Sequence, residues 1–216
     1  MKRRSLPVAA ALTATAALLL TACSSGDDKA GDNDKIAGAD QGGEASSPSP
    51  RTAPSPERPR ISLPGDVKNV FDGWTIGDPG KDAVLADVKQ RINATDAAIA
   101  AGDPDAETLG LYYKGEALVG VAEWVQGYVD DGKSITGTVR FYKPDLVMVD
   151  KDTAAFAYCA DETKAFDKDR KTGKADQNAV TDDAYVAYNT RVEKNQDGVW
   201  QTSSLLSERG NAKCTP

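Results

Sequence analysis

Apolar residues recur at helical spacing in the first half of the region that begins at residue 61. Over residues 81–101 they form one stripe, spaced three to four residues apart: Leu85, Val88, Ile92, Thr95 as a polar member, and Ile99. Asp78-Pro79 supplies a cap and a first-turn proline before this segment, and Gly102 supplies a stop after it. The pattern therefore predicts a helix over residues 81–101.

Two further helices are expected before residue 132. A short one covers about residues 104–113, and the next covers residues 116–130. The second carries an apolar stripe with Trp124 beside it: Leu118, Val121, Val125 and Tyr128. Prolines and glycines interrupt any long period in residues 61–80, so an irregular or short helical lead-in is expected there. By the same spacing, four acids of the helices are expected on polar faces: Asp82, Asp87, Asp96 and Glu123.

From Lys133 onward the apolar spacing changes to two, which is typical of strands. Residues 135–142 form a first strand that Pro144 interrupts. Two hairpins are expected after it, over residues 146–160 and 185–206, and the second turns at Asp197-Gly198. The charged stretch 161–183 between them is expected to be a long exposed ribbon or loop. Helices followed by antiparallel strands predict an α+β domain over residues 61–216.

The first 22 residues have the three parts of a secretory signal: a charged start, an apolar run and small residues before Cys23. The apolar run is shorter than the roughly 20 residues of a membrane-spanning helix. Leu20-Thr21-Ala22-Cys23 resembles the lipobox of bacterial lipoproteins, in which the cysteine receives a diacylglyceryl group after cleavage. This resemblance implies a lipid on Cys23 that holds the protein at the extracytoplasmic face of the cell membrane. The alternative is an ordinary secretory signal followed by a chance cysteine.

Residues 23–60 contain mostly small and polar residues, with Ile36 as the one large aliphatic side chain, and are expected to be a disordered linker. Five prolines between Pro48 and Pro59 stiffen its second half, as suits a spacer that reaches through a cell wall. Removing residues 1–22 removes three positive charges and no negative ones, which changes the formal charge from -7 to -10. An acidic surface of this size disfavours nucleic acid and anionic lipid headgroups as partners.

Once Cys23 carries a lipid, Cys159 and Cys214 remain as an even pair in an exported protein. We predict that they form a disulfide that ties the C-terminus to a strand in the middle of the domain. The chain-entropy model gives a stabilisation on the order of 4 kcal/mol for a loop of this length. A redox or metal-binding thiol pair is the alternative, but the spacing is far from Cys-x-x-Cys.

Histidine is absent from the sequence, which excludes Ser-His-Asp and Cys-His nucleophiles and histidine zinc sites. Phosphate-binding glycine loops are also missing. Residues 167–173 begin like a calcium loop, but Lys171 stands at the fifth position and Gly173 comes one place late. We therefore expect no catalytic residue, metal or cofactor. An isomerase-like mechanism would need only a carboxylate base and a tyrosine hydroxyl in an apolar cavity.

The order of helices and then a meandering sheet resembles the nuclear-transport-factor-2-like cone, the fold shared by ketosteroid isomerase and many small-ligand binders. Together with the lipobox, linker and late cysteine, it also resembles uncharacterised lipoproteins of actinobacteria such as Streptomyces. In that fold the helices cover a strongly bent sheet and leave an apolar cavity. The resemblance implies six residues as its lining: Trp124, Tyr128, Phe141, Tyr158, Tyr188 and Trp200.

These observations favour an envelope lipoprotein that binds a small apolar ligand or a protein partner without catalysis. Two alternatives stay open. One is an isomerase- or hydrolase-like enzyme on the same fold, and the other is a structural accessory whose cavity is filled.

Overall fold

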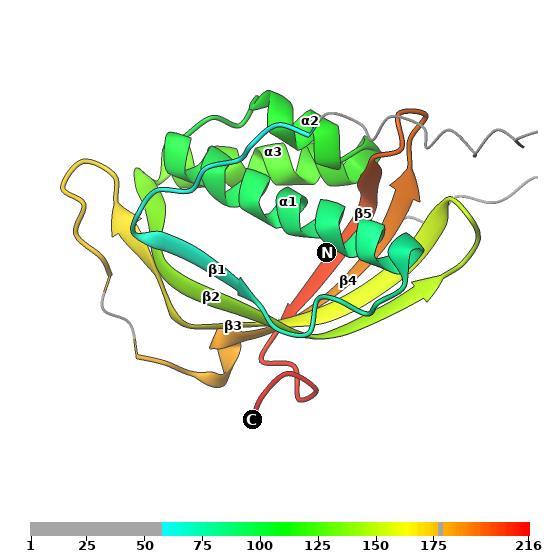
Figure 1. The fold of residues 1–216 in the computed structure, drawn as a ribbon. Helices are drawn as coiled ribbons and strands as arrows, with labels where there is room; N and C mark the ends of the chain where they lie inside the picture. Colours follow the sequence, from blue (N-terminus) through cyan, green and yellow to red (C-terminus); the bar gives the residue numbers. More distant parts are fainter. Residues whose placement is uncertain (1–57, 177–178) are drawn as a thin grey trace, which may run out of the picture. The chain divides into compact units, whose positions relative to one another are not determined.

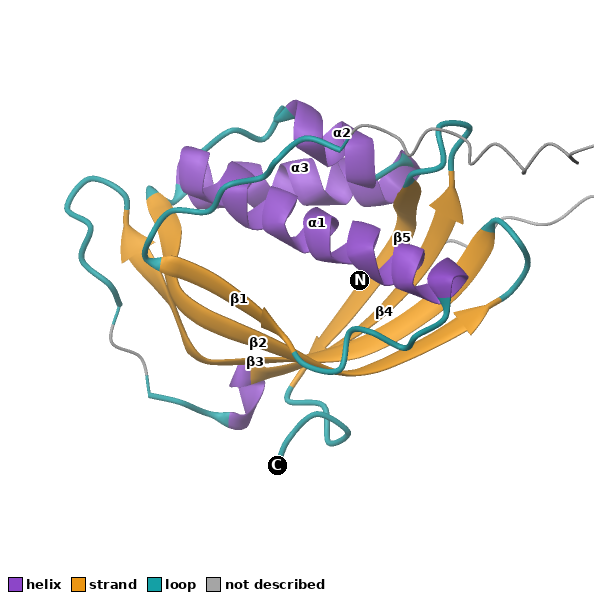
Figure 2. Cartoon of the chain, viewed as in Figure 1, coloured by secondary structure: helices purple, strands orange, loops and turns teal. Residues whose placement is uncertain are grey.

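Helices and strands form two layers in the computed structural model, which describes residues 58–176 and 179–216. Three helices, α1 (Pro79–Ala101), α2 (Glu107–Tyr112) and α3 (Gly115–Asp130), lie over one face of a curved five-stranded sheet (Figures 1 and 2). The expected α+β class, with helices packed on a curved sheet, is confirmed. The predicted signal, Cys23 and nearly all of the predicted linker lie outside the described residues.

The sheet follows the chain as a meander, in the order β1-β2-β3-β4-β5. The strands β2 (Lys133–Met148), β3 (Thr153–Asp169), β4 (Tyr185–Lys194) and β5 (Trp200–Arg209) pair antiparallel. A short 3₁₀ helix, Asp182–Ala184, precedes β4. Both expected hairpins are present, with β5 extending beyond the predicted end.

The strand β1 (Val67–Phe71) corrects the prediction of an irregular or short helical lead-in. It pairs parallel with β2, so that Val67 lies opposite Gly137 and Phe71 opposite Phe141. Parallel pairing to a distant segment leaves little local signal, because the partner strand begins more than sixty residues later. The sheet is therefore mixed, with one parallel edge strand.

The hairpin of β2 and β3 is longer than the sequence indicated. Pro144 does not end β2, because the strand continues through a register shift between Tyr142 and Asp145. The first part of the charged stretch, residues 161–169, is paired strand and not an exposed ribbon. Gly137 has a φ of 99° beside a second irregularity, where the strand bends.

Helix α1 forms where the sequence predicted it, because its local stop and start signals are strong. Asp78 accepts a hydrogen bond from the backbone N–H of Lys81 at 3.0 Å, Pro79 opens the first turn, and Gly102 ends the helix with a φ of 71°. Arg170, at the end of β3, donates to the carbonyls of Ile99 and Ala100 at 2.6 and 2.9 Å. These contacts satisfy the open end of α1.

The disulfide between Cys159 and Cys214 is present, which confirms the predicted pairing. It fastens the C-terminal segment to β3, and Figure 1 shows this segment on the side of the sheet away from the helices. The Tyr142 hydroxyl adds a hydrogen bond to the carbonyl of Cys214. One staple therefore holds the chain end against the outer sheet face.

Candidate functional site

The interior between α1 and the sheet contains four of the six residues predicted to line a cavity. Phe141, Tyr158 and Trp200 are buried, and Tyr188 is partly buried against them. Tyr158 stacks on Tyr188 with ring centroids 4.9 Å apart and on Phe156 at 5.2 Å. These rings therefore pack on one another.

Trp74 occupies the centre of this aromatic interior, a position that the sequence patterns did not predict. Its ring lies 5.0 Å from that of Phe156, 5.2 Å from Tyr158 and 6.2 Å from Phe141. Trp74 belongs to the loop that follows β1, so its position depends on the strand that the sequence did not predict. It belongs to the same buried cluster as Leu85 and Val88 of α1, and its backbone carbonyl accepts a hydrogen bond from Lys89 at 2.8 Å.

A buried arginine forms the polar part of the interior. Arg91 of α1 is 3% exposed and donates to the hydroxyls of Tyr113 and Tyr158 at 3.0 and 2.6 Å. Thr95, one turn later, bonds the Tyr113 hydroxyl at 2.8 Å. Burial lowers the pKa of Arg91, but the two tyrosine hydroxyls outweigh it, so that its pKa is raised and the side chain stays charged.

Two acids of α1 have surroundings that differ from the prediction of polar faces. Asp87 is fully buried, so that prediction was wrong for it. Asp96 is partly buried and accepts a hydrogen bond at 2.6 Å from the amide of Asn69, which also contacts Asn93. Burial raises the pKa of Asp96 to about 6, although the bond from Asn69 opposes the shift.

The chemistry open to Asp96 is proton transfer near neutral pH. An isomerase-like site would also need a tyrosine hydroxyl aimed at the reacting oxygen. The nearby Tyr158 hydroxyl is already bonded to Arg91. The described residues thus supply a carboxyl of suitable pKa, but the Tyr158 hydroxyl already accepts a hydrogen bond from Arg91.

The structure separates Trp124 from the four interior residues. Its side chain is 53% exposed on α3, and its ring makes an edge contact with Tyr128 at 5.5 Å. Tyr128 is partly buried and donates to Asp167 at 3.1 Å. Helical spacing alone placed Trp124 beside the apolar stripe, but the stripe faces the sheet and Trp124 does not.

The outer face of α3 is a surface that the sequence patterns did not predict. We use this name for the exposed residues of the helix: Gly115, Glu116, Val119, Gly120, Glu123, Trp124, Gln126, Gly127 and Asp130. Two of them, Val119 and Trp124, are large apolar side chains that are 58% and 53% exposed. They are five residues apart, so they lie at the two edges of this face, with Gly120, Glu123 and Gly127 between them. Exposed apolar side chains on a helix face favour a partner contact.

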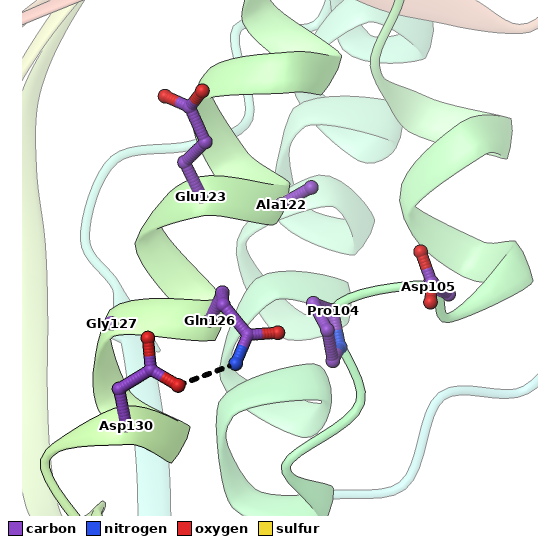
Figure 3. A pocket seen from close by; sticks show the side chains of 7 residues that line it. All are labelled: Pro104, Asp105, Ala122, Glu123, Gln126, Gly127 and Asp130. Carbon is purple, nitrogen blue, oxygen red and sulfur yellow. Dashed lines mark hydrogen bonds between the residues drawn. The ribbon is translucent and has the colours of Figure 1, made fainter.

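An open depression of about 400 Å³ lies along this face, between α3 and the loop that joins α1 to α2. Pro104 and Asp105 line it from the loop, opposite side chains of α3 (Figure 3). Glu123 and Asp130 contribute carboxylates from α3, and Gln126 donates to Asp130 at 2.7 Å. Three carboxylates therefore border the depression.

Metal and membrane sites are not evident in the described part of the chain. No group of three or more acidic or cysteine side chains there could hold a metal ion. Among the described residues, no helix is both apolar enough and long enough to cross a bilayer.

The curved sheet with helices on one face is the arrangement implied by the resemblance to the nuclear-transport-factor-2-like cone. No family model matches the chain, and no curated protein is similar enough in sequence to count as a relative.

Several solved structures have a related arrangement. Aln2 from a Streptomyces species is 16% identical, with 62% of this chain and 94% of that chain covered and a TM-score of 0.42. The hexachlorocyclohexane dehydrochlorinase LinA-type3 from Novosphingobium barchaimii is 12% identical, with 61% and 90% covered and a TM-score of 0.41. A ketosteroid isomerase-like protein from Erwinia carotovora atroseptica is 15% identical, with 57% and 94% covered and a TM-score of 0.35. Likeness at this level carries no conclusion about activity.

Proposed function

We propose that this protein is an envelope lipoprotein, of the kind found in actinobacteria, that binds a protein partner through the outer face of α3. The lipid on Cys23 would hold it at the extracytoplasmic face of the membrane, as the lipobox-like Leu20-Thr21-Ala22-Cys23 implies. The Cys159–Cys214 disulfide supports export, because disulfides persist in oxidising compartments. The domain would then be a binding module outside the cell membrane.

One observation carries the choice of a protein partner over a small apolar ligand. Trp74, Phe156 and Tyr158 pack ring against ring where the cone would hold such a ligand. A small molecule would have to displace contacts that stabilise the core. The exposed Trp124 and Val119, by contrast, are apolar side chains without a covering segment among the described residues.

Two measurements test this proposal. Labelled palmitate should enter the wild-type chain in a bacterial host but not Cys23→Ala, and the variant should appear in the medium. Retention of the variant at the membrane would contradict lipid anchoring. Native mass spectrometry of the extracted chain should give the mass of the lipidated polypeptide with one disulfide. A stoichiometric small molecule on the intact chain would favour the ligand-binding alternative instead.

Asp96 favours a second candidate, an isomerase- or hydrolase-like enzyme. Its raised pKa suits a general base, and Asn69 already orients it. Native mass spectrometry of both chains tests this candidate. If the Asp96→Asn variant keeps a bound small molecule unchanged while the wild type converts it to a product, the enzyme is the better account. If neither chain carries a small molecule, the enzyme candidate loses its support.

A further inference from the structure

Two glycines of α3 leave space on its outer face that no described residue occupies. Gly120 lies one helical turn before Trp124, and Gly127 lies about one turn after it. A methyl group on either would meet nothing within 4 Å. Glycine in a helix interior costs about 1 kcal/mol relative to alanine. The fold itself therefore gains nothing from these glycines, whereas a segment that approaches the helix closely would use the space.

The charge around this face is one-sided. Seven acidic residues lie between residues 102 and 132: Asp103, Asp105, Glu107, Glu116, Glu123, Asp130 and Asp131. The same stretch has one basic residue, Lys114, whose ammonium group pairs with Glu193 on β4 at 2.6 Å. Within the part of the chain that the structure describes, none of the seven acids forms an ion pair.

Some acids on the sheet side differ in this respect, although Asp145 and Glu208 there form no ion pair among the described residues. Asp66, Asp161 and Glu162 each pair with a lysine or arginine from another segment.

Arg170 is a cation near this loop, since its guanidinium lies beside Gly102, but it forms no ion pair with the seven acids. Their excess negative charge would attract a positively charged partner.

Charge also decides between possible occupants. Residues 24–57 of this chain contain seven acidic and three basic side chains, so the field of α3 would repel its own linker. A second copy would bring an equally acidic face, and anionic lipid headgroups would be repelled as well.

We infer that the outer face of α3 binds a basic segment of a partner protein, one that carries lysine or arginine next to an apolar side chain. The cations would lie at the depression bordered by Asp105, Glu123 and Asp130, and the apolar side chain would lie over the two glycines against Trp124. An arginine could also stack on the exposed indole. This inference rests on the proposed function, to which it adds the chemistry of the partner.

The test is selection of a displayed library of random short peptides on the full chain in detergent. Selected peptides should be enriched in lysine and arginine beside apolar residues. Charge reversal by Glu123→Lys with Asp130→Lys should weaken their binding at least about tenfold, and Trp124→Ala should also weaken it. Asp145→Lys with Glu208→Lys is the matched control, because both acids are exposed on the sheet and the change in net charge is the same. This control should bind the peptides as the wild type does.

Each other outcome overturns the inference in a different way. If binding of the selected peptides depends on Trp124 but the peptides are not enriched in basic residues, the inferred chemistry of the partner is wrong, whereas the proposed protein-binding face stands. Basic peptides that bind both charge-reversed chains equally would show a non-specific attraction to an acidic protein. If no selected peptide depends on Trp124 or Glu123, the binding face fails too. Self-association that Trp124→Ala abolishes, measured by sedimentation, would assign the face to a second copy.

Discussion

Arg58 and Asp87 form an ion pair that joins the start of the domain to the middle of α1. The guanidinium Nη2 of Arg58 lies 2.7 Å from Oδ2 of Asp87, and its Nε bonds the other carboxylate oxygen. Asp87 is fully buried and also accepts the backbone N–H of Trp200 at 2.9 Å. The hydrogen bond to Asp87 raises the pKa of Arg58. The chain is therefore held to the domain from residue 58, three residues before the predicted boundary.

Arg58→Ala should lower the free energy of unfolding by about 2–4 kcal/mol, because it leaves a buried carboxylate without its cation. Urea unfolding of the variant and the wild type measures the difference. Arg60→Ala is the control, since Arg60 is exposed two residues away, and it should change stability by less than about 0.5 kcal/mol. Equal effects of the two substitutions would show that the ion pair contributes nothing specific.

Loss of the disulfide should destabilise the domain by a similar or larger amount. With a sequence separation of 55 between the cysteines, Cys159→Ser combined with Cys214→Ser should lower the free energy of unfolding by on the order of 4 kcal/mol. Reduction of the wild-type chain should produce the same shift of the denaturation midpoint. An unchanged midpoint after verified reduction would contradict a stabilising role.

Gly137 is needed where β2 bends. Its φ is 99°, and a Cβ there would lie 2.1 Å from the backbone carbonyl oxygen of Lys164. Gly137→Ala should therefore cost about 3 kcal/mol or prevent folding. Gly120→Ala, in open space on α3, should instead stabilise the domain by about 0.5–1 kcal/mol. Thermal unfolding of both variants checks the contrast, and a tolerated alanine at 137 would refute the bend.

The pKa of Asp96 predicts a pH dependence of stability. The folded carboxyl has a pKa of about 6, whereas an unfolded aspartate titrates near about 3.9. Between these values the folded state binds the extra proton, so the free energy of unfolding falls as pH rises from about 4 to about 6. The contribution is on the order of 1–3 kcal/mol.

Asp96→Asn removes the titratable carboxyl and so isolates its contribution to the pH dependence of stability. The difference in unfolding free energy between wild type and variant should change across this pH window and stay constant above it. A carbon-detected NMR titration should give a pKa of about 6 for the Asp96 carboxyl. An ordinary pKa for Asp96, together with a difference in unfolding free energy that does not change with pH, would remove the physical basis of the enzyme alternative.

Local patterns were sufficient to predict α1, α3 and most of the sheet. The cap at Asp78, the stop at Gly102 and the stripe between them all lie within one segment. The strand β1 was missed because its stability comes from pairing with β2, and its five residues carry little periodicity of their own.

The polar part of the interior could not be predicted in the same way. Asp87 accepts hydrogen bonds from residues 58 and 200, and Arg91 donates hydrogen bonds to residues 113 and 158. One signal was present: Asp87, Arg91 and Thr95 are spaced by four on a helix that is apolar on both sides of them. Such a polar stripe between two apolar ones indicates buried polar contacts.

The candidate binding face was missed for a different reason. Spacing placed Trp124 next to the buried stripe of α3, and only the packing of the helix against the sheet shows that its ring faces outward. The charge imbalance of residues 102–132 was visible in the sequence, but its meaning depends on which cations lie nearby in space.

Photo-crosslinking in the source cells tests the central claim most directly. A photoreactive residue in place of Val119, on the outer face of α3, should give a discrete crosslinked protein that disappears when Glu123 and Asp130 are both changed to lysine. The same residue in place of Val147, which is equally exposed on the sheet, should give none. A crosslink at position 147 alone would contradict a protein-binding face on α3. The same conclusion would follow if neither position gave a crosslink and the chain carried a bound small molecule.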